Sequence, residues 1–245
     1  MTEGFSFAFC PVSPPLQALS CITVSERKLL SEKATPKRIG DFIAGRVAAK
    51  LAIRSHLFLP DSLPLSILRT EHGNEAGKPC AVIDDAGTIL PEIHLSITHA
   101  DKKAYAAASH TRIGIDNVTI EPYNDAFVQD VFQLEELRAW ANWLRSDCSH
   151  PLAVCTGFAA KEAFLKWLGI GLRGTLPMTQ IIPLSQTVSQ SLFFQKQFHA
   201  ACYVHHETGD TPELRILDGY FSIQDGQVIV LLTQGHSQMK QIKLR

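Results

Sequence analysis

The chain has 245 residues, which at ~150 residues per domain allows one large domain or two small ones. A hydrophobic content of 45% can form a substantial core and excludes an intrinsically disordered chain. With 23 basic and 24 acidic residues the formal charge is −1, which excludes a globally basic nucleic-acid-binding protein but not a local basic patch. No basic segment precedes the apolar N-terminal stretch, and the longest uncharged run, 174–195, is polar. We therefore expect neither a secretory signal nor a membrane span.

The cysteines indicate reduced thiols rather than a disulfide framework or a zinc site. They form no CxxC pair, and no HExxH or Cys/His zinc spacing occurs. A cytoplasmic protein is the expectation that follows. The six residues are Cys10, Cys21, Cys80, Cys148, Cys155 and Cys202.

The first half of the chain is predicted to contain a strand, a long helix and three further strands. Alternating phenylalanines at 5, 7 and 9 predict the first strand. Thr35 and Pro36 are typical of an N-cap and the first helical residue. Residues 59–78 are rich in turn signals, and short apolar runs at 93–98, 104–109 and 113–116 predict consecutive strands. The apolar stripe expected on the helix is Ile39, Phe42, Ile43, Val47 and Leu51.

The second half repeats the order of helix and then strands. Helical spacing predicts one helix over residues 125–144, and Pro151 opens another that ends near Gly169. Apolar runs then predict strands at 193–198, 200–204, 214–223 and 228–233, with turns at Asp218-Gly219 and Asp225-Gly226. Both halves are therefore of α+β character.

Two short motifs have simpler explanations than function. The run Gly169 to Gly174 matches GxGxxG, but a helix precedes it where a dinucleotide site needs a strand, so a helix stop and a turn explain it better. Asp61-Ser62-Leu63 matches the tripeptide around the modified serine of acyl carrier proteins. It lies between two prolines and not at a helix start, which indicates a chance match.

Several charged residues allow both a functional and a structural interpretation. Arg46, Lys50 and Arg54 are four residues apart, which places them on one helix face as either a solvated surface or a phosphate-binding stripe. Glu162 and Lys166 also share a helix face, as a surface ion pair or as site residues.

Other polar residues lie at the ends of the predicted central strands. His99, at a strand end, is a better site candidate than His94, which points to the opposite face and is expected to be structural. Asp116 ends a short apolar strand, where an acid is costly to bury unless it is paired or binds a metal.

In combination, these residues resemble the 4′-phosphopantetheinyl transferases, most closely the long, surfactin-synthetase-activating type. The family's hallmark is a GxD motif followed by a (W/F)xxKExxxK motif. Gly114-Ile115-Asp116 and the run from Phe158 to Lys166 match both in order. Arg46, Gly77-Lys78-Pro79 and Ile97-Thr98-His99 extend the likeness, which covers residues 35–178.

The resemblance implies a reaction in which the phosphopantetheine arm of coenzyme A moves to a serine of an acyl or peptidyl carrier protein and adenosine 3′,5′-bisphosphate leaves. Mg²⁺ is the implied cofactor, with Asp116 and Glu162 as its ligands. Glu162, Lys166 and Asp116 are the implied catalytic residues, with Lys166 stabilising charge on the pyrophosphate. Glu162 is either the base or only a metal ligand, since a tightly bound carboxylate cannot easily be both, and the sequence leaves both roles open. The residues expected to bind coenzyme A are Arg46, Lys78, Pro79, Thr98, His99, Asp116, Lys161 and Lys166.

The chain departs from the family at one acidic position. Relatives commonly show GxDxE, whereas this chain has Val118 at the position of the second acid. We expect a two-carboxylate site with more water ligands, because Mg²⁺ tolerates them. Asn117 is expected to point to the opposite strand face, and Glu121 is expected to be too distant to replace the acid.

The resemblance also implies two pseudo-equivalent α+β lobes that form a pseudo-dimer within one monomeric chain, residues 1–118 and 119–245. The apolar residues Phe127, Val131 and Phe132 are either a carrier-protein docking surface or core. Two other functions stay open. A degenerate protein could bind coenzyme A or the carrier without catalysis, and a nucleic-acid-binding or phosphate-binding module could use the Arg46 stripe.

Overall fold

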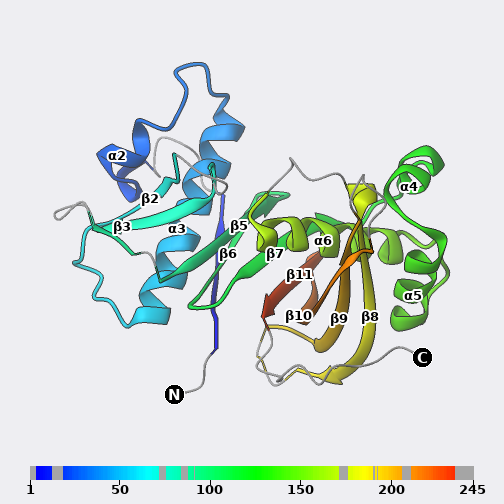
Figure 1. Ribbon diagram of the computed structural model, residues 1–245. Helices are drawn as coiled ribbons and strands as arrows, with labels where there is room; N and C mark the ends of the chain where they lie inside the picture. Colours follow the sequence, from blue (N-terminus) through cyan, green and yellow to red (C-terminus); the bar gives the residue numbers. More distant parts are fainter. Residues whose placement is uncertain are drawn as a thin grey trace.

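The computed structural model describes residues 4–12, 19–71, 76–83, 88–90, 92–170, 176–189, 191, 193–205 and 211–234 (Figure 1). The helices are α2 (Val24–Arg27), α3 (Pro36–Leu57), α4 (Asp125–Val131), α5 (Leu134–Leu144) and α6 (Pro151–Leu168), with 3₁₀ turns η1 (Leu19–Cys21) and η3 (Leu176–Met178). The first seven strands are β1 (Ser6–Pro11), β2 (Leu65–Arg69), β3 (Pro79–Ile83), β4 (Thr88–Ile89), β5 (His94–Ala100), β6 (Lys103–Ser109) and β7 (Ile113–Thr119). The last four are β8 (Thr179–Val188), β9 (Lys196–Val204), β10 (Glu213–Gln224) and β11 (Gln227–Gln234).

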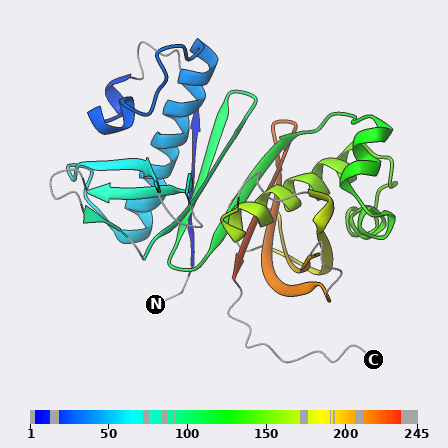
Figure 2. The same ribbon diagram turned by 45° about the horizontal axis from the view of Figure 1, so that its top comes forward.

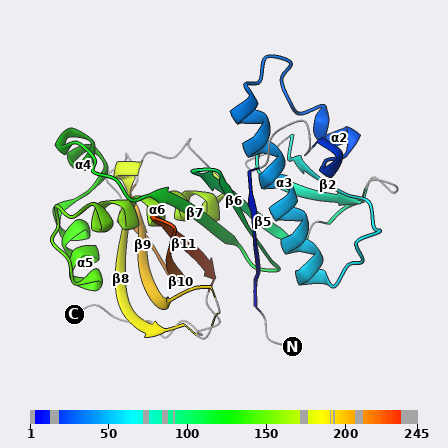
Figure 3. The same cartoon turned by 180° about the vertical axis from the view of Figure 1, so that it is seen from behind.

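The strands within the described ranges form three antiparallel sheets, which confirms the mixed α+β class. Their orders are β1-β6-β5, β2-β3-β4 and β7-β11-β10-β9-β8. Helix α3 packs on β1, β5 and β6, and helix α6 packs on β7 and β11 (Figure 2). The edge strands β5 and β7 lie side by side where these two assemblies meet, as Figure 3 shows from behind. No helix within the described ranges is both long and apolar enough to cross a membrane.

Both long helices begin where the sequence predicts. The Thr35 hydroxyl accepts a hydrogen bond from the Arg38 N–H at 3.3 Å, and Pro36 takes the first helical position of α3. Helix α6 ends at Gly169, which has φ of 83° and so adopts the left-handed C-cap that glycine favours. Residues 171–174 of the GxGxxG match lie outside the described residues.

The apolar stripe expected on α3 is only partly right. Leu51 is 47% exposed, whereas Ala48, Ala49 and Ala52 are completely buried. These small side chains let the helix approach the alanine-rich strand β6 closely, and a stripe defined by large apolar residues does not include them.

The helix predicted over residues 125–144 is two helices. Phe132 has extended backbone angles, φ −119° and ψ 141°, and separates α4 from α5. Its ring packs against Gly157, where an added Cβ would lie 2.7 Å from a ring carbon. A tertiary contact therefore causes the break, and no proline or glycine marks it in the sequence.

The strand predictions are correct for β1, β5, β6, β7, β10 and β11, but need three corrections elsewhere. Strands β2, β3, β4 and β8 were not expected, and residues 196–204 form one continuous strand, β9. Asp218-Gly219 lies within β10 and is not a turn. Glycine is required there because a Cβ would lie 2.2 Å from the Phe198 ring. Asp225-Gly226 is the predicted turn, with positive φ at both residues.

Candidate active site

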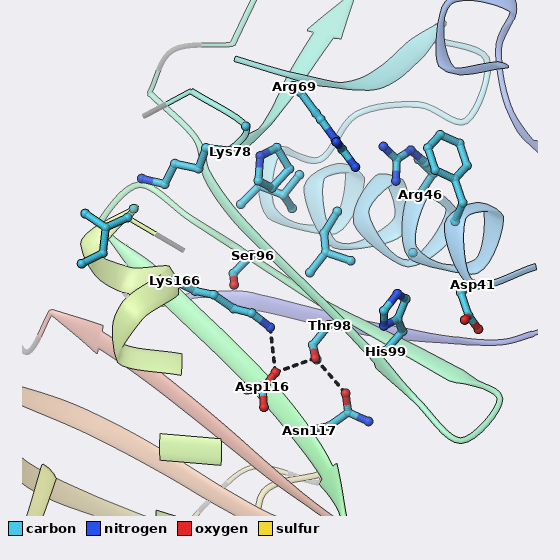
Figure 4. Close-up of a pocket in the computed structure, with 18 of the residues that line it drawn as sticks. Asp41, Arg46, Arg69, Lys78, Ser96, Thr98, His99, Asp116, Asn117 and Lys166 are labelled. Atoms are coloured by element: carbon cyan, nitrogen blue, oxygen red, sulfur yellow. Dashed lines mark hydrogen bonds and ion pairs between the residues drawn. The ribbon is translucent and has the colours of Figure 1, made fainter. Parts of the chain in front are cut away.

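A cavity of about 790 Å³ lies where β5 and β7 meet (Figure 4). The Ser96 hydroxyl accepts a hydrogen bond from the Ile115 N–H at 3.0 Å, so a side chain joins these two edge strands. The walls of the cavity come from α3, the connection between β2 and β3, strands β5 and β7, and the C-terminal end of α6. Most of the predicted binding residues line it, namely Arg46, Lys78, Pro79, Thr98, His99, Asp116 and Lys166.

One glycine explains why the two hallmark motifs lie together. A Cβ on Gly114 would lie 1.9 Å from the Ala163 carbonyl oxygen and 2.7 Å from the Trp167 nitrogen. The backbone of the GxD strand therefore lies directly against the backbone of the KExxxK helix, because Gly114 has no side chain to separate them. This close approach brings Asp116 to Lys166, although they are 50 residues apart in the chain.

One end of the cavity is rich in guanidinium groups. Arg46 is 8% exposed, its guanidinium carbon lies 3.4 Å from the centroid of the Phe42 ring, and its Nε has no hydrogen-bond partner. The pKa of Arg46 is lowered to about 10, chiefly by burial and also by the charges of Arg69 and Arg38, against the charge of Glu26. Arg46 stays protonated at neutral pH, so this end suits a phosphate dianion.

Arg38 and Arg69 were not expected at the site. The lining residues of α3, at positions 38, 41, 42, 45 and 46, follow the spacing of one helix face, and this pattern could have identified Arg38. Arg69 ends strand β2, which was itself missed, and reaches toward Arg46 in Figure 4.

The other end holds an ion pair. Lys166 Nζ lies 2.7 Å from Asp116 Oδ1 and donates to the Ile115 carbonyl at 3.0 Å. The Thr98 hydroxyl lies 2.8 Å from the same carboxylate oxygen and 2.9 Å from Asn117 Oδ1, as the dashed lines in Figure 4 show. Asp116 is therefore buried with partners, which meets the requirement for an acid at a strand end.

Glu162 does not line the cavity but lies near enough to Asp116 to interact electrostatically. Burial raises the pKa of Glu162, the charge of Asp116 raises it further, and the charge of Lys166 lowers it. Two carboxylates that repel each other in this way fit a divalent cation, whose preferred ligands are carboxylate oxygens. Among the described residues, no group of three or more His, Cys, Asp or Glu side chains could hold a metal ion, so such a site would rely on additional water ligands.

Lys161 does not contact the cavity, which corrects its expected role in binding coenzyme A. The side chain is fully buried, and its ammonium lies 2.9 Å from Glu136 Oε2 and 3.1 Å from the Leu176 carbonyl oxygen. It also donates to the Thr179 carbonyl. A cation with these partners holds helix α6 to α5 and β8 and cannot contact a ligand.

The cationic stripe on α3 is not a single phosphate-binding surface. Lys50 pairs with the buried Glu26 at 2.7 Å, and Arg54 donates to the carbonyl oxygens of Pro60 and Leu63. Only Arg46 of the three reaches the cavity.

The strand residues next to Asp116 differ from expectation in one respect. Val118 is 8% exposed and lies in the core, so it contributes no ligand. Asn117, expected on the opposite face, lines the cavity and contacts Thr98. His99 is exposed at the cavity wall, whereas His94 does not line it.

The candidate docking residues are mostly core. Val131 and Phe132 are 6% and 9% exposed and belong to one hydrophobic cluster. Phe127 is half-buried and stacks on Tyr123 at 4.5 Å between ring centroids. The core interpretation is therefore correct for Val131 and Phe132.

Comparisons with known proteins point to one family. Residues 112–221, just under half of the chain, match the model of the 4′-phosphopantetheinyl transferase superfamily. This is a family of transferases that generally use Mg²⁺. The matched region contains both hallmark motifs, and no curated protein matches the chain.

Proposed function

We propose that the chain is a 4′-phosphopantetheinyl transferase of the long, surfactin-synthetase-activating type. It moves the phosphopantetheine arm of coenzyme A to a serine of an acyl or peptidyl carrier protein. The observation that carries this proposal is the arrangement of one cavity, with guanidinium groups at one end and Asp116, Lys166 and the nearby Glu162 at the other. Coenzyme A carries a 3′-phosphate and a pyrophosphate, and the two ends provide cations for both.

The cationic residues divide between the two phosphate groups. Arg46 and Arg69 provide charge for the 3′-phosphate, together with the exposed His99. Lys78, in the connection before β3, and Pro79, the first residue of β3, would contact the adenosine end. Lys166 would contact the pyrophosphate from the last turns of α6.

In the transfer, the serine oxygen forms a bond to the phosphorus next to the pantetheine arm. The bond from that phosphorus to adenosine 3′,5′-bisphosphate breaks. Glu162, as the general base, takes the serine proton. The leaving phosphate is weakly basic and needs no general acid, so Lys166 stabilises its charge instead.

Asp116 and Glu162 would hold Mg²⁺, which when bound supplies positive charge to the pyrophosphate. In the structure Lys166 provides the counter-charge to Asp116 at 2.7 Å. Since Val118 supplies no third carboxylate, additional waters would complete the coordination.

We further propose that residues 1–118 and 119–245 are two pseudo-equivalent lobes of one monomeric chain. A matched pair of buried contacts supports this proposal. Glu26 pairs with Lys50 and accepts the Ile67 N–H at 2.8 Å, and Glu136 pairs with Lys161 and accepts the Ile181 N–H at 2.8 Å. In each case the acid precedes a long helix, the lysine lies on that helix, and the N–H belongs to the next strand.

A non-catalytic protein that binds coenzyme A or the carrier is the second candidate. The absence of an acid at Val118 favours it, and the retention of Asp116, Glu162 and Lys166 opposes it. The nucleic-acid alternative has lost its main support, because Lys50 and Arg54 are engaged within the protein.

Mass spectrometry distinguishes transfer from binding. An apo carrier protein incubated with the chain, coenzyme A and Mg²⁺ should gain roughly 340 Da, the mass of the arm. Glu162→Gln should lose this activity by roughly a hundredfold or more while staying folded, because a general base contributes 10²–10⁴-fold. Glu121→Gln, which changes an exposed acid, is the matched control and should stay active. Coenzyme A binding without a mass gain by the native chain would establish the non-catalytic alternative.

A further inference from the structure

A chain of hydrogen bonds leads from the cavity wall into the interior. Asn117 Oδ1 lies 2.9 Å from the Thr98 hydroxyl, and Asn117 Nδ2 donates to Gln227 Oε1 at 2.9 Å. Gln227 Nε2 in turn donates to the Ala100 carbonyl at 3.1 Å. Asn117 and Gln227 are 5% and 1% exposed, so the chain is shielded from water and joins β5, β7 and β11.

The Ala100 carbonyl sets the direction of every bond in this chain. A backbone carbonyl can only accept, so Gln227 must turn its NH₂ group toward it and its oxygen toward Asn117. Asn117 must then donate to Gln227 and present its own oxygen to Thr98. Asn117 is thus fixed with its side-chain oxygen toward Thr98, where it accepts a hydrogen bond.

Thr98 therefore has one proton and two acceptors. Asp116 Oδ1 lies at 2.8 Å and Asn117 Oδ1 at 2.9 Å from its hydroxyl, and Asp116 Oδ1 also contacts Lys166. A cation that binds Asp116 through Oδ1 competes with both of these donors. Thr98 is 7% exposed, and a buried hydroxyl proton without an acceptor is costly.

We propose that Asn117, held in place by Gln227, is a positioning residue that gives Thr98 a second acceptor and so frees Asp116 to bind a divalent cation. When the cation takes the carboxylate, the Thr98 proton turns to Asn117 and no buried donor is left unpaired. The inference rests on the proposed function, because transfer requires that cation. It has particular weight here since Val118 leaves the site with few carboxylates.

Gln227→Met tests this role without altering the cavity wall, because Gln227 does not line the cavity. Gln224→Met is the matched control. Gln224 is the cross-strand neighbour of Gln227 and bonds Ser222 instead. The readout is the Mg²⁺ dissociation constant, measured by calorimetry on the full chain without coenzyme A. Gln227→Met should raise this dissociation constant about tenfold, and Gln224→Met should raise it by less than about threefold.

A double-mutant cycle separates positioning from general structural damage. In a Thr98→Val background no hydroxyl proton competes for Asp116, so Gln227→Met should not change Mg²⁺ affinity further. Asn117→Leu, which also removes the amide, should behave like Gln227→Met and serves if the latter does not fold. The proposal is overturned if a folded Gln227→Met or Asn117→Leu variant keeps the native Mg²⁺ affinity. It is also overturned if Gln227→Met lowers Mg²⁺ affinity as much in the Thr98→Val background as in the native chain.

Arm transfer by the native chain is measured in parallel, so that the two proposals fail separately. Transfer combined with Mg²⁺ affinity that does not depend on Gln227 overturns the positioning role alone. Mg²⁺ affinity that depends on Gln227 without any transfer overturns the proposed function alone. At saturating Mg²⁺ the kcat of Gln227→Met should return to within about threefold of the native value.

Discussion

The Arg46 guanidinium is held in a state that favours an anionic ligand. Burial and two neighbouring cations, Arg38 and Arg69, all oppose its charge, and its Nε lacks a hydrogen-bond partner. Stacking on Phe42 and the charge of Glu26 favour the charged form. A phosphate at this position would neutralise repulsion and satisfy a buried donor at once, so binding gains from both effects.

This arrangement predicts selectivity for the 3′-phosphate of coenzyme A. Arg69→Met should raise the KM for coenzyme A about tenfold, the value of one lost charge-assisted contact, and leave the KM for dephospho-coenzyme A nearly unchanged. Arg69 is exposed, so the variant should fold normally. Arg138→Met, an exposed position on α5 remote from the cavity lining, is the control. Equal losses for the two substrates would place the 3′-phosphate elsewhere.

At the scale of elements, the contact between α6 and β7 determines whether the site exists. The two motifs supply Asp116 from the strand and Glu162 and Lys166 from the helix, and they meet only because Gly114 has no side chain. The strand also pairs with β11 through its other edge, which fixes its position from the opposite side.

Gly114→Ala should therefore damage stability and site together. The added Cβ would collide with backbone atoms of α6, which cannot move away as a flexible side chain can. We expect a loss of about 3 kcal/mol or more in the free energy of unfolding, measured with urea.

Gly226→Ala is the comparison for that variant. Its Cβ would meet open space, and only its φ of 75° opposes alanine, so the cost should be about 1 kcal/mol. Gly114 has no positive φ, so similar losses in the two variants would show that the helix–strand contact accommodates a methyl group and does not require glycine at position 114.

Helix caps and apolar runs, which are visible within a few residues of sequence, correctly predicted several helices and strands. The caps at Thr35 and Gly169 and the apolar strands around 93–116 belong to this group. Strand β8 was missed because it lies at a sheet edge, where its second half is exposed and polar, without the alternation of a half-buried strand.

The order of the motifs in the sequence predicted some of the residues of the candidate site. Asp116, Lys166 and Thr98, which the resemblance names as site residues, contact one another. Lys161 was misassigned because its partner, Glu136, lies on a different helix and no local pattern connects them. Asn117 was misassigned because the alternation of side chains along a single strand does not take the neighbouring strand into account. Between β7 and β5, side-chain hydrogen bonds such as Thr98 to Asn117 join the two strands.

At the scale of the whole molecule, the two buried Glu–Lys pairs suggest why one site is present. Each pair fastens a long helix to its neighbouring strand in the same way. The residue after Lys161 is Glu162, whereas the residue after Lys50 is the exposed Leu51. The proposed lobes thus share a structural device, and the second also carries the acid that the proposed transfer needs.

The pair Glu136–Lys161 makes a prediction about pH and stability. Lys161→Met leaves a fully buried carboxylate without its counter-charge and should cost about 3–5 kcal/mol at neutral pH. Burial raises the pKa of Glu136 from 4.5 to about 7 even though Lys161 lowers it, so the variant should have a still higher pKa. The folded state then binds more protons than the unfolded chain above pH 4.5, and its stability falls as pH rises. In urea unfolding, the deficit of Lys161→Met relative to the native chain should therefore be smallest at about pH 5 and grow toward about pH 8.

The double variant Glu136→Leu/Lys161→Met is the control for this prediction. It removes both charges, so its stability relative to the native chain should recover to within about 2 kcal/mol and lose the steep decline above neutral pH. Lys50→Met tests the first pair, since it leaves Glu26 equally buried and should cost a similar ~3–5 kcal/mol. A Lys161→Met deficit that stays constant with pH would show that Glu136 is not the group left unpaired. A small loss in Lys50→Met would show that the two pairs do not have equivalent roles, and would weaken the case for equivalent lobes.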